Sequence, residues 1–302
     1  MEASRIVELE RLVARRLSRE VFSLRPINVA CACPVFRGVS PGCPDVFVKV
    51  TSVPAAERSV EFLTFAEAVP YLPRTLFADI PQMSDGKAVL CLEFLSAEMI
   101  PAERMTSAQA ESFAENVVDF ANLLTRYFGS VAPSSEEDDP THQYAELSAY
   151  AERHPFVARF LRPLLDLPPC EREYGERMRS VIHGDFQPKN YGFQGDRFAA
   201  VFDTDDLTNG LPCEDAAYAF TERARRNLSH KARTRLETYL LQLIARSPWP
   251  KDEWLFAINH ARLRIAARRL ANHPDSSFIA FDIFRRDRPL ARLADRVRNF
   301  NA

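Results

Sequence analysis

Three polar residues in one part of the chain have the types and spacing that phosphoryl transfer requires. Asp185 and Asn190 lie in the segment HGDFQPKN, residues 183–190, and Asp203 follows after about the length of one hairpin. Transfer from a metal-bound nucleotide needs one carboxylate to accept a hydroxyl proton, and oxygen ligands to hold Mg²⁺. We assign the first role, that of general base, to Asp185, and the second to Asn190 and Asp203. A surface turn or a strand cap would explain any one of these residues alone, but it explains the three together poorly.

The neighbouring residues predict the elements that position these side chains. Residues 181–182 form a short β-branched run before the segment, and residues 191–193 predict a short strand after it. Residues 194–196 predict a turn, and residues 197–202 predict a second strand that ends at Asp203. We therefore expect Asp185 on a loop and Asp203 at the end of a hairpin.

The chain begins with a strand-rich part and continues with a mostly helical part. Strands are predicted at residues 46–50, 75–80 and 88–95, and helices at residues 5–21 and 55–69. Further helices are predicted at residues 106–127, 141–165, 214–227, 229–246, 251–272 and 286–299. Thr106 and Gln109 have the spacing of a capping box at the start of the first of these. The pattern predicts an α+β fold, which we divide into residues 1–95 and 96–302.

The HGDFxxxN pattern of residues 183–190, followed by an apolar strand that ends in Asp203, resembles the aminoglycoside phosphotransferase and choline kinase-like superfamily. The resemblance covers about residues 25–270. It implies a bilobal protein kinase-like fold, with a small antiparallel-sheet N-terminal lobe that binds nucleotide and a larger, mostly helical C-terminal lobe. It also implies ATP or GTP as the phosphoryl donor, Mg²⁺ as a cofactor and a small molecule with a hydroxyl group as the acceptor.

Lys49 stands in the middle of an apolar strand, where an unpaired charge is costly. By the resemblance, such a lysine contacts the α- and β-phosphates and pairs with a glutamate on the following helix. Glu61 and Glu57 both qualify, and we favour Glu61 because it precedes the apolar Phe62. The alternative interpretation is an edge-strand lysine that resists aggregation.

Residues 89–95 resemble the strand-to-hinge segment of these kinases. By this match, the Glu93 carbonyl and the Leu95 N–H bind the adenine edge, and Leu92 lies behind the ring. An ordinary core strand explains the apolar residues equally well. Residues 29–43 contain two glycines and no Gly-x-Gly-x-x-Gly loop, so the backbone groups that contact the phosphates are not assigned.

Of four further residues near the segment, two receive a role and two do not. By the resemblance, His183 braces the loop and takes no part in the chemistry. We interpret Asp215 as a structural residue, although its place at a helix N-terminus alone would also explain it. Contact with a second metal by Asp205, and contact with the γ-phosphate by Lys189, are both left open.

Composition and charge exclude several classes of protein. Hydrophobic residues make up 46% of the chain, enough for a full core, and the net charge of −2 argues against a general nucleic-acid binder. No apolar run is long enough to span a bilayer, and the first residues lack the apolar centre of a secretory signal. The six cysteines have neither a disulfide-framework nor a zinc-site spacing, so we expect reduced thiols in a cytoplasmic protein. The oligomeric state is not predicted.

The acceptor is the part of the function that the sequence defines least. Residues 251–302 carry eleven bases and six acids, and one predicted helix contains Arg262, Arg264, Arg268 and Arg269. Arginine suits carboxylate or phosphate groups, which favours a neutral or anionic acceptor such as a sugar derivative over an aminoglycoside. Surface arginines that pair with nearby acids are at least as good an explanation. Another antibiotic or an amino alcohol also stays open.

Three functional hypotheses follow from these patterns. A small-molecule kinase is favoured because Asp185, Asn190 and Asp203 are all present. A protein kinase is less well supported, because Asp203 is followed by Thr204 and Asp205 instead of Phe and Gly, and the chain lacks an Ala-Pro-Glu triplet. A catalytically silent nucleotide-binding pseudokinase is the remaining alternative.

Overall fold

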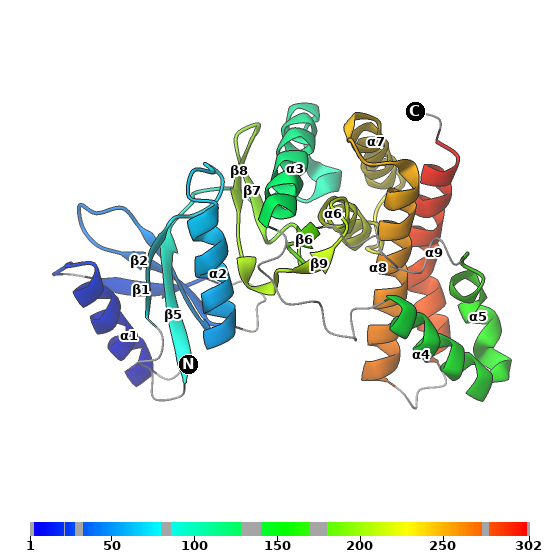
Figure 1. Cartoon of the computed structure of the whole chain (residues 1–302), viewed down its shortest axis with the longest axis horizontal. Coiled ribbons are helices and arrows are strands. Elements are labelled where there is room, and N and C mark those ends of the chain that lie inside the picture. Colours follow the sequence, from blue (N-terminus) through cyan, green and yellow to red (C-terminus); the bar gives the residue numbers. More distant parts are fainter. Residues whose placement is uncertain are drawn as a thin grey trace. The chain divides into compact units, whose positions relative to one another are not determined.

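The computed structural model of the protein describes residues 3–20, 22–27, 33–79, 86–127, 140–168, 180–273 and 278–300. The chain forms two compact units, one of residues 1–99 and 189–206 and the other of residues 100–188 and 207–302 (Figure 1). The sequence predicts a single contiguous division at residue 95. In the structure, the segment 189–206 belongs to the first unit.

The first unit is built on a five-stranded antiparallel sheet with the strand order β1-β2-β3-β5-β4. The strands span Ser23–Pro26 (β1), Val35–Val39 (β2), Val46–Ser52 (β3), Thr75–Asp79 (β4) and Lys87–Glu93 (β5). Strand β3 pairs with β5 along its whole length, from Val46 opposite Glu93 to Ser52 opposite Lys87. The side chains on a strand alternate between the two faces of the sheet, so β3 presents Lys49 and Thr51 on one face.

Two helices accompany the sheet, α1 (Ala3–Arg16) and α2 (Val53–Phe65). Helix α1 is amphipathic, and its buried residues Leu9 and Val13 join the apolar cluster of the strands. Helix α2 begins directly after β3, where the side chain of Ser52 accepts a hydrogen bond from the Ala55 N–H. The proline at position 54 suits the first turn, because its missing N–H would have no partner there.

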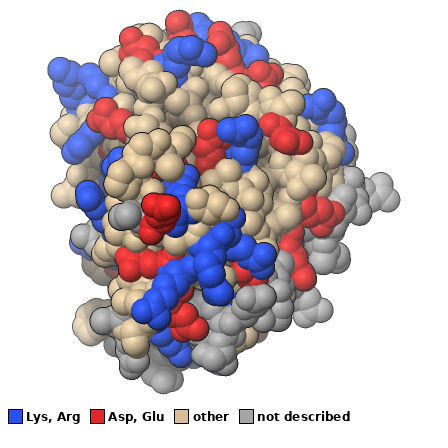
Figure 2. All heavy atoms as spheres, turned by 90° about the vertical axis from the view of Figure 1, so that its left-hand side faces the viewer, with Lys and Arg blue, Asp and Glu red and all other residues tan. Residues whose placement is uncertain are grey.

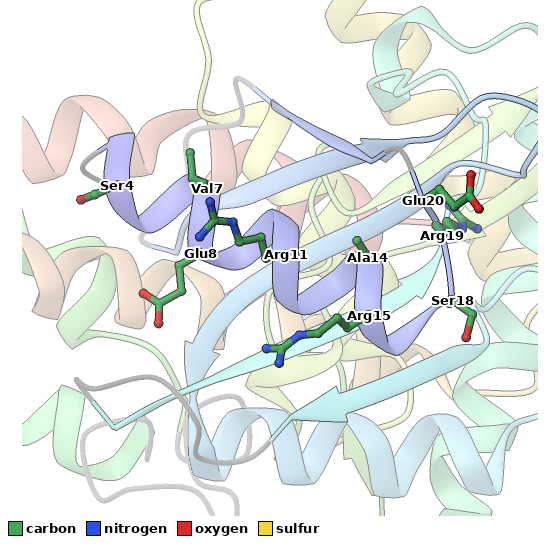
Figure 3. Close-up of a pocket in the computed structure, with 9 residues that line it drawn as sticks. All are labelled: Ser4, Val7, Glu8, Arg11, Ala14, Arg15, Ser18, Arg19 and Glu20. Atoms are coloured by element: carbon green, nitrogen blue, oxygen red, sulfur yellow. The ribbon is translucent and has the colours of Figure 1, made fainter.

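The outward face of α1 is polar. Glu8, Arg11 and Arg15 extend from the exposed side of the helix beside a shallow hollow of about 830 Å³ (Figure 3). On the face of the molecule drawn in Figure 2, Lys and Arg side chains form a band with Asp and Glu side chains close by. Interspersed charges of both signs are typical of a solvated surface. Among the described residues, no helix is both long enough and apolar enough to cross a membrane.

A β-hairpin from the middle of the chain completes the first unit. Its strands are β7 (Tyr191–Gln194) and β8 (Arg197–Val201), close to the predicted positions. Phe193 forms a β-bridge with Glu98, in which each N–H donates to the other residue's carbonyl at 2.8 and 2.9 Å. The Val201 N–H donates to the Tyr71 carbonyl at 2.8 Å. These backbone bonds fix the hairpin to the segments that flank β4 and β5.

The second unit is mostly helical. Its helices are α3 (Ser107–Tyr127), α4 (Pro140–Arg153), α5 (Pro155–Leu165), α6 (Glu214–Ala224), α7 (His230–Arg246), α8 (Lys251–Asn272) and α9 (Ile279–Arg298). The short strands β6 (Ser180–Ile182) and β9 (Thr208–Gly210) pair with each other. The predicted capping box is present, because the Gln109 N–H donates to the Thr106 hydroxyl and the Thr106 N–H donates to the Gln109 side chain. Leucine and isoleucine side chains from α4, α5, α8 and α9 form one apolar cluster.

Two predicted helices differ from the structure by more than a few residues at one end. The single helix expected over residues 141–165 is two helices, α4 and α5, which are separated at His154. The ring of Pro155 disfavours helical backbone in the preceding residue, and His154 has φ −128° and ψ 64°. Helix α9 begins at Ile279 instead of residue 286, because its buried apolar face already includes Ile279, Ala280 and Ile283.

The described cysteines, at positions 33, 43, 91 and 213, are free thiols. The other two cysteines and the acidic run at residues 136–139 lie outside the described residues.

Candidate active site

A buried lysine on β3 lies at the centre of a charged cluster in the first unit. Lys49 is 6% exposed, and its ammonium group forms ion pairs with Asp203 and, at 2.6 Å, with Asp205. Burial alone would lower the pKa of Lys49, but the carboxylates of Asp205 and Asp203 outweigh burial and raise the pKa. Lys49 is therefore a permanently charged cation on a buried, mainly apolar strand.

Asp205 holds this cluster in place through both of its carboxylate oxygens. Oδ1 accepts a hydrogen bond from the Ser59 hydroxyl at 2.8 Å, and Oδ2 accepts one from the Thr51 hydroxyl at 3.0 Å. The guanidinium of Arg58 donates to the backbone carbonyl of Asp205 at 3.1 and 3.2 Å. Protein groups thus occupy both oxygens of Asp205, which favours a role in positioning Lys49 over contact with a second metal.

The expected ion pair between Lys49 and Glu61 is absent from the described structure, and this part of the prediction is corrected. Helix α2 turns Ser59 and Phe62 inward, so that Glu61 faces solvent, as does the alternative partner, Glu57. Successive residues on a helix are rotated by about 100°, so a carboxylate next to a buried position points elsewhere. Asp205 takes the place that we assigned to Glu61.

The two expected metal ligands lie at the open end of the β7–β8 hairpin. The Phe202 N–H donates to the Asn190 carbonyl at 2.9 Å, which places Asn190 beside the residue that precedes Asp203. Asp203 has a φ of 64°, a left-handed conformation that residues other than glycine adopt rarely and mostly at functional sites. Both side chains line one cavity, where an amide oxygen and a carboxylate form a donor set that suits Mg²⁺.

This cavity has a volume of about 230 Å³ and belongs wholly to the first unit. Its charged end carries Lys49, Asn190 and Asp203. The segment that contains Glu93 and Leu95 also lines it, and Glu93 lies opposite Val46, three residues along β3 from Lys49. The rest of the wall is mainly apolar and includes Val35, Phe47, Pro73, Leu92, Phe94 and Met99. Among the described residues, no hydrogen-bond acceptor faces the Leu95 N–H. An apolar slot with one charged end suits a ligand that has a flat ring and phosphate groups.

The loop that carries Asp185 belongs to the second unit, and hydrogen bonds to Asp215 hold its backbone. The Asp215 carboxylate accepts hydrogen bonds from the His183 N–H at 2.6 Å and the Gly184 N–H at 3.2 Å. Gly184 has a φ of 79°, which glycine adopts without strain. Burial raises the pKa of Asp215 to about 6, although His183 and the two N–H groups oppose the rise. Asp215 is thus structural, as we interpret it from the sequence.

His183 packs against aromatic side chains of the loop and of α3. It is fully buried, and its ring lies 5.6 Å from the ring of Phe186 and 6.3 Å from that of Phe120. Its Nδ1 accepts a hydrogen bond from the Asp185 N–H at 3.4 Å. These contacts agree with the bracing role that the resemblance implies.

Asp185 itself is half-buried at the surface of the loop. Its Oδ1 accepts a hydrogen bond from the Gln187 side chain at 2.6 Å. The ring of Tyr218, on α6, lies near enough for the charge of Asp185 to act on it. Burial raises the pKa of Tyr218, the Arg264 guanidinium opposes that rise, and Asp185 adds to it. Asp185 is thus a carboxylate that the Gln187 side chain helps to orient and that lies close to Tyr218 of α6.

The four arginines of α8 do not form one group. Arg262 is 4% exposed and forms a two-point ion pair with Asp287, at 2.7 and 2.9 Å. It also donates to Asn259 at 2.6 Å and to the Pro163 carbonyl at 3.2 Å. Arg262 is therefore a structural residue of the helical core, unlike the other three, which line a pocket.

Five of the expected residues line one cavity, namely Lys49, Glu93, Leu95, Asn190 and Asp203, and sequence reasoning missed the residues that support them. Thr51 could have been found, because it lies two residues after Lys49 and so on the same face of β3. Ser59 gave no signal, since a buried serine on a helix more often packs than binds. The role of Asp205 depends on the helix rotation described above, which spacing does not define.

Comparison with known proteins agrees with this architecture. The profile described as "Phosphotransferase enzyme family" matches residues 35–255, most of the chain. A search of curated proteins found no match.

Solved structures of three kinds share the fold. The apo structure of a thermostable mutant of aminoglycoside phosphotransferase APH(4)-Ia is 17% identical, with a TM-score of 0.63, over 94% of this chain and 98% of that one. Amicoumacin kinase hAmiN, in complex with AMP-PNP, Ca²⁺ and Ami, is 10% identical, with a TM-score of 0.63, over 99% and 98% of the two chains. The GDP complex of aminoglycoside 2'-phosphotransferase-IIIa is 13% identical, with a TM-score of 0.61, over 95% and 99%.

These likenesses confirm the predicted protein kinase-like fold, and the profile match confirms the predicted superfamily and enzyme class. The chain belongs to the phosphotransferase enzyme family.

Proposed function

We propose that this protein transfers the γ-phosphate of ATP or GTP to a hydroxyl group of a small molecule. The observation that carries the proposal is the cavity of the first unit. It combines the buried cation Lys49 and the oxygen donors Asn190 and Asp203 with the segment of Glu93 and Leu95. A flat base and a chain of phosphates need these groups in one slot.

Each residue has one role in this proposal. Lys49 binds the α- and β-phosphate oxygens, and Asp205 keeps its ammonium group at the cavity. The backbone of Glu93 and Leu95 binds the edge of the base. Mg²⁺, held by Asn190 and Asp203, would neutralise charge on the phosphate oxygens.

Asp185 is the proposed general base. The acceptor oxygen forms a bond to the γ-phosphorus, the bond from that phosphorus to the bridging oxygen breaks, and the nucleoside diphosphate leaves with the electron pair. The hydroxyl proton passes to the Asp185 carboxylate, which the Gln187 side chain orients by a hydrogen bond. Related proteins with the same fold have been solved with AMP-PNP or GDP, which supports a nucleotide as the donor.

The test measures Mg²⁺-dependent consumption of ATP and GTP across a panel of aminoglycosides, other antibiotics, amino alcohols, sugars and sugar derivatives. For an acceptor that wild type uses, Asp185→Asn should lower kcat by roughly 100- to 10,000-fold, the usual contribution of a general base. The variant should still bind nucleotide, since Asp185 is not part of the nucleotide cavity. Asp119→Asn, an exposed aspartate on α3, is the matched control and should keep full activity.

Two results would contradict the proposal. Full turnover by Asp185→Asn would show that another group accepts the proton. Tight nucleotide binding by wild type, with no transfer to any compound of the panel, would favour the catalytically silent pseudokinase.

A further inference from the structure

A pocket rich in arginine lies beside the loop of Asp185 in the second unit. It has a volume of about 200 Å³, between α6 and α8, and we call it the arginine pocket. Its four cationic residues are Arg225, Arg264, Arg268 and Arg269. The volume is room for roughly seven water-sized groups, since a water molecule takes about 30 Å³ in the liquid.

The arginine pocket continues toward the loop of Asp185. Tyr218 and Arg264 line it, and the same two residues line a smaller cavity whose wall also includes Gly184. Gly184 directly precedes Asp185 in the chain. A ligand in the arginine pocket therefore lies next to the loop that carries the proposed general base.

Arg264 is the residue whose position most clearly indicates a ligand. Its guanidinium lies over the ring of Tyr218, 4.6 Å from the ring centre, so its flat face is covered. The N–H groups of a guanidinium point outward in its plane, and stacking leaves them available as donors. Within the described part of the chain, no carboxylate lies within ion-pair distance of Arg264.

The other groups of the pocket add positive charge. Glu222 is the acidic residue in the wall, and its carboxylate is already paired with Arg225 and, at 2.7 Å, with Arg226. The Nε–H of Arg225 is buried and has no acceptor among the described residues. Arg269 is paired with Asp282 at 3.7 Å, so the guanidinium that a ligand would meet without a carboxylate at ion-pair distance is that of Arg264. An anion would supply acceptors for Arg264 and for the Nε–H of Arg225.

Helix-end electrostatics alone does not explain these arginines. Basic residues in the last turn of a helix compensate its dipole, which accounts for Arg269 near the end of α8 at Asn272. Arg264 lies about two turns before that end, where the dipole has little effect. The helix dipole therefore does not account for Arg264.

We propose that the arginine pocket binds an oxyanion, a carboxylate or a phosphate monoester, that belongs to the hydroxyl-bearing acceptor. This inference rests on the proposed function, since it names the class of acceptor for the same reaction. The acceptor is then a polyhydroxylated acid or a sugar phosphate rather than a polycationic antibiotic. Arg264 makes the main contact, and Arg268, at the exposed rim, adds to it.

The experiment compares four compounds on one sugar scaffold: glucose, glucuronate, glucose 1-phosphate and glucosamine. Binding of each to the nucleotide-free full-length protein is measured by ligand-observed NMR, and phosphoryl transfer from ATP is measured in parallel. Arg264→Gln and Arg268→Gln are the test variants. Arg292→Gln, an exposed arginine on α9 outside the pocket, is the matched control.

We expect saturable binding of glucuronate or glucose 1-phosphate, weaker binding of glucose and none of glucosamine. Loss of one charged contact should weaken the anion by roughly 10- to 100-fold in Arg264→Gln. Arg268→Gln should show a smaller loss in the same direction, and Arg292→Gln none. Preference between the two anions then identifies carboxylate or phosphate as the natural group.

The results also separate this inference from the proposed function. Anion binding that depends on Arg264, without any phosphoryl transfer, would support the pocket and contradict the proposed activity. Transfer to glucose or glucosamine that is unaffected by Arg264→Gln would support the activity and overturn the pocket. Failure of both anions to bind wild type would overturn the pocket as well.

Discussion

An Asp205→Asn variant should lose about 3 kcal/mol of stability in the first unit at neutral pH. Asn keeps the shape of the side chain but removes the charge that Lys49 faces at 2.6 Å. Breaking a buried ion pair costs about 3–5 kcal/mol when a charge is left unpaired, and less here because Lys49 keeps Asp203. The amide can accept from Ser59 or from Thr51 but not from both, and the lost hydrogen bond adds about 1 kcal/mol.

The same change should weaken nucleotide binding. Without Asp205, Lys49 is held by Asp203 alone, so the lysine competes for an oxygen that the proposed metal site requires. Mutation of a residue that orients a metal-site group typically costs about 10- to 100-fold, and we expect the KM for nucleotide to rise by at least the lower figure.

Glu61→Gln is the matched control, because it tests the carboxylate that sequence reasoning assigned to Lys49. Glu61 is exposed on α2, so the variant should stay within about 0.5 kcal/mol of wild type, with an unchanged KM. Both tryptophans, Trp249 and Trp254, lie in the second unit, so their fluorescence does not report on the first. Amide hydrogen exchange of residues 46–65, measured by mass spectrometry, follows the local stability directly. If Glu61→Gln speeds exchange and raises KM while Asp205→Asn does neither, the assignment of Asp205 is refuted.

Two further predictions concern the second unit. Burial raises the pKa of Asp215 from 3.8 to about 6. Its contribution to the free energy of unfolding is therefore fully present below pH 3.8 and is lost as pH rises through 6, a change of about 3 kcal/mol. Urea titrations give the free energy of unfolding of wild type and of Asp215→Asn, and the difference between the two should fall between pH 4 and 7. The same difference measured with Asp119→Asn should not change with pH. A pH-independent difference for Asp215→Asn would contradict the raised pKa. Asp287→Ala should cost about 3–5 kcal/mol, since it strands the buried Arg262, as read from tryptophan fluorescence in urea. Asp295→Ala, an exposed change on α9, should cost no more than about 1 kcal/mol, and equal losses for the two variants would refute the buried-pair argument.

The features that the sequence predicted well are those that local physics determines. The apolar runs of β3 and β5, the β7–β8 hairpin and the capping box at Thr106 each depend on neighbours within a few positions. The residues expected to bind nucleotide and metal were named mainly because residues 89–95 and 183–203 resemble segments of the superfamily. For these, the local pattern and the final structure agree.

The features that were missed depend on rotation and on long-range contact. Arg262 and Arg264 are two residues apart on one helix, which places them on opposite sides of α8. One pairs with Asp287 in the core, and the other lines the arginine pocket. The sequence shows two arginines on the same helix, and only the packing of α8 distinguishes their roles. The partner of Lys49 was misassigned for the same reason, since the rotation of α2 decides which carboxylate can approach.

The two units divide the proposed chemistry in a way that mutations can separate. In the first unit, Lys49 forms ion pairs with two carboxylates, those of Asp203 and Asp205, before any nucleotide binds. Burial of an unpaired cation costs free energy, and the ion pairs with the two aspartates offset that cost when the protein folds. The lysine is therefore already in position when phosphates bind. In the second unit, the orientation of the Asp185 loop depends on two backbone N–H groups bound to Asp215. Damage to the Lys49 cluster should therefore appear in nucleotide affinity, and damage to Asp185 in the rate of transfer at saturating nucleotide.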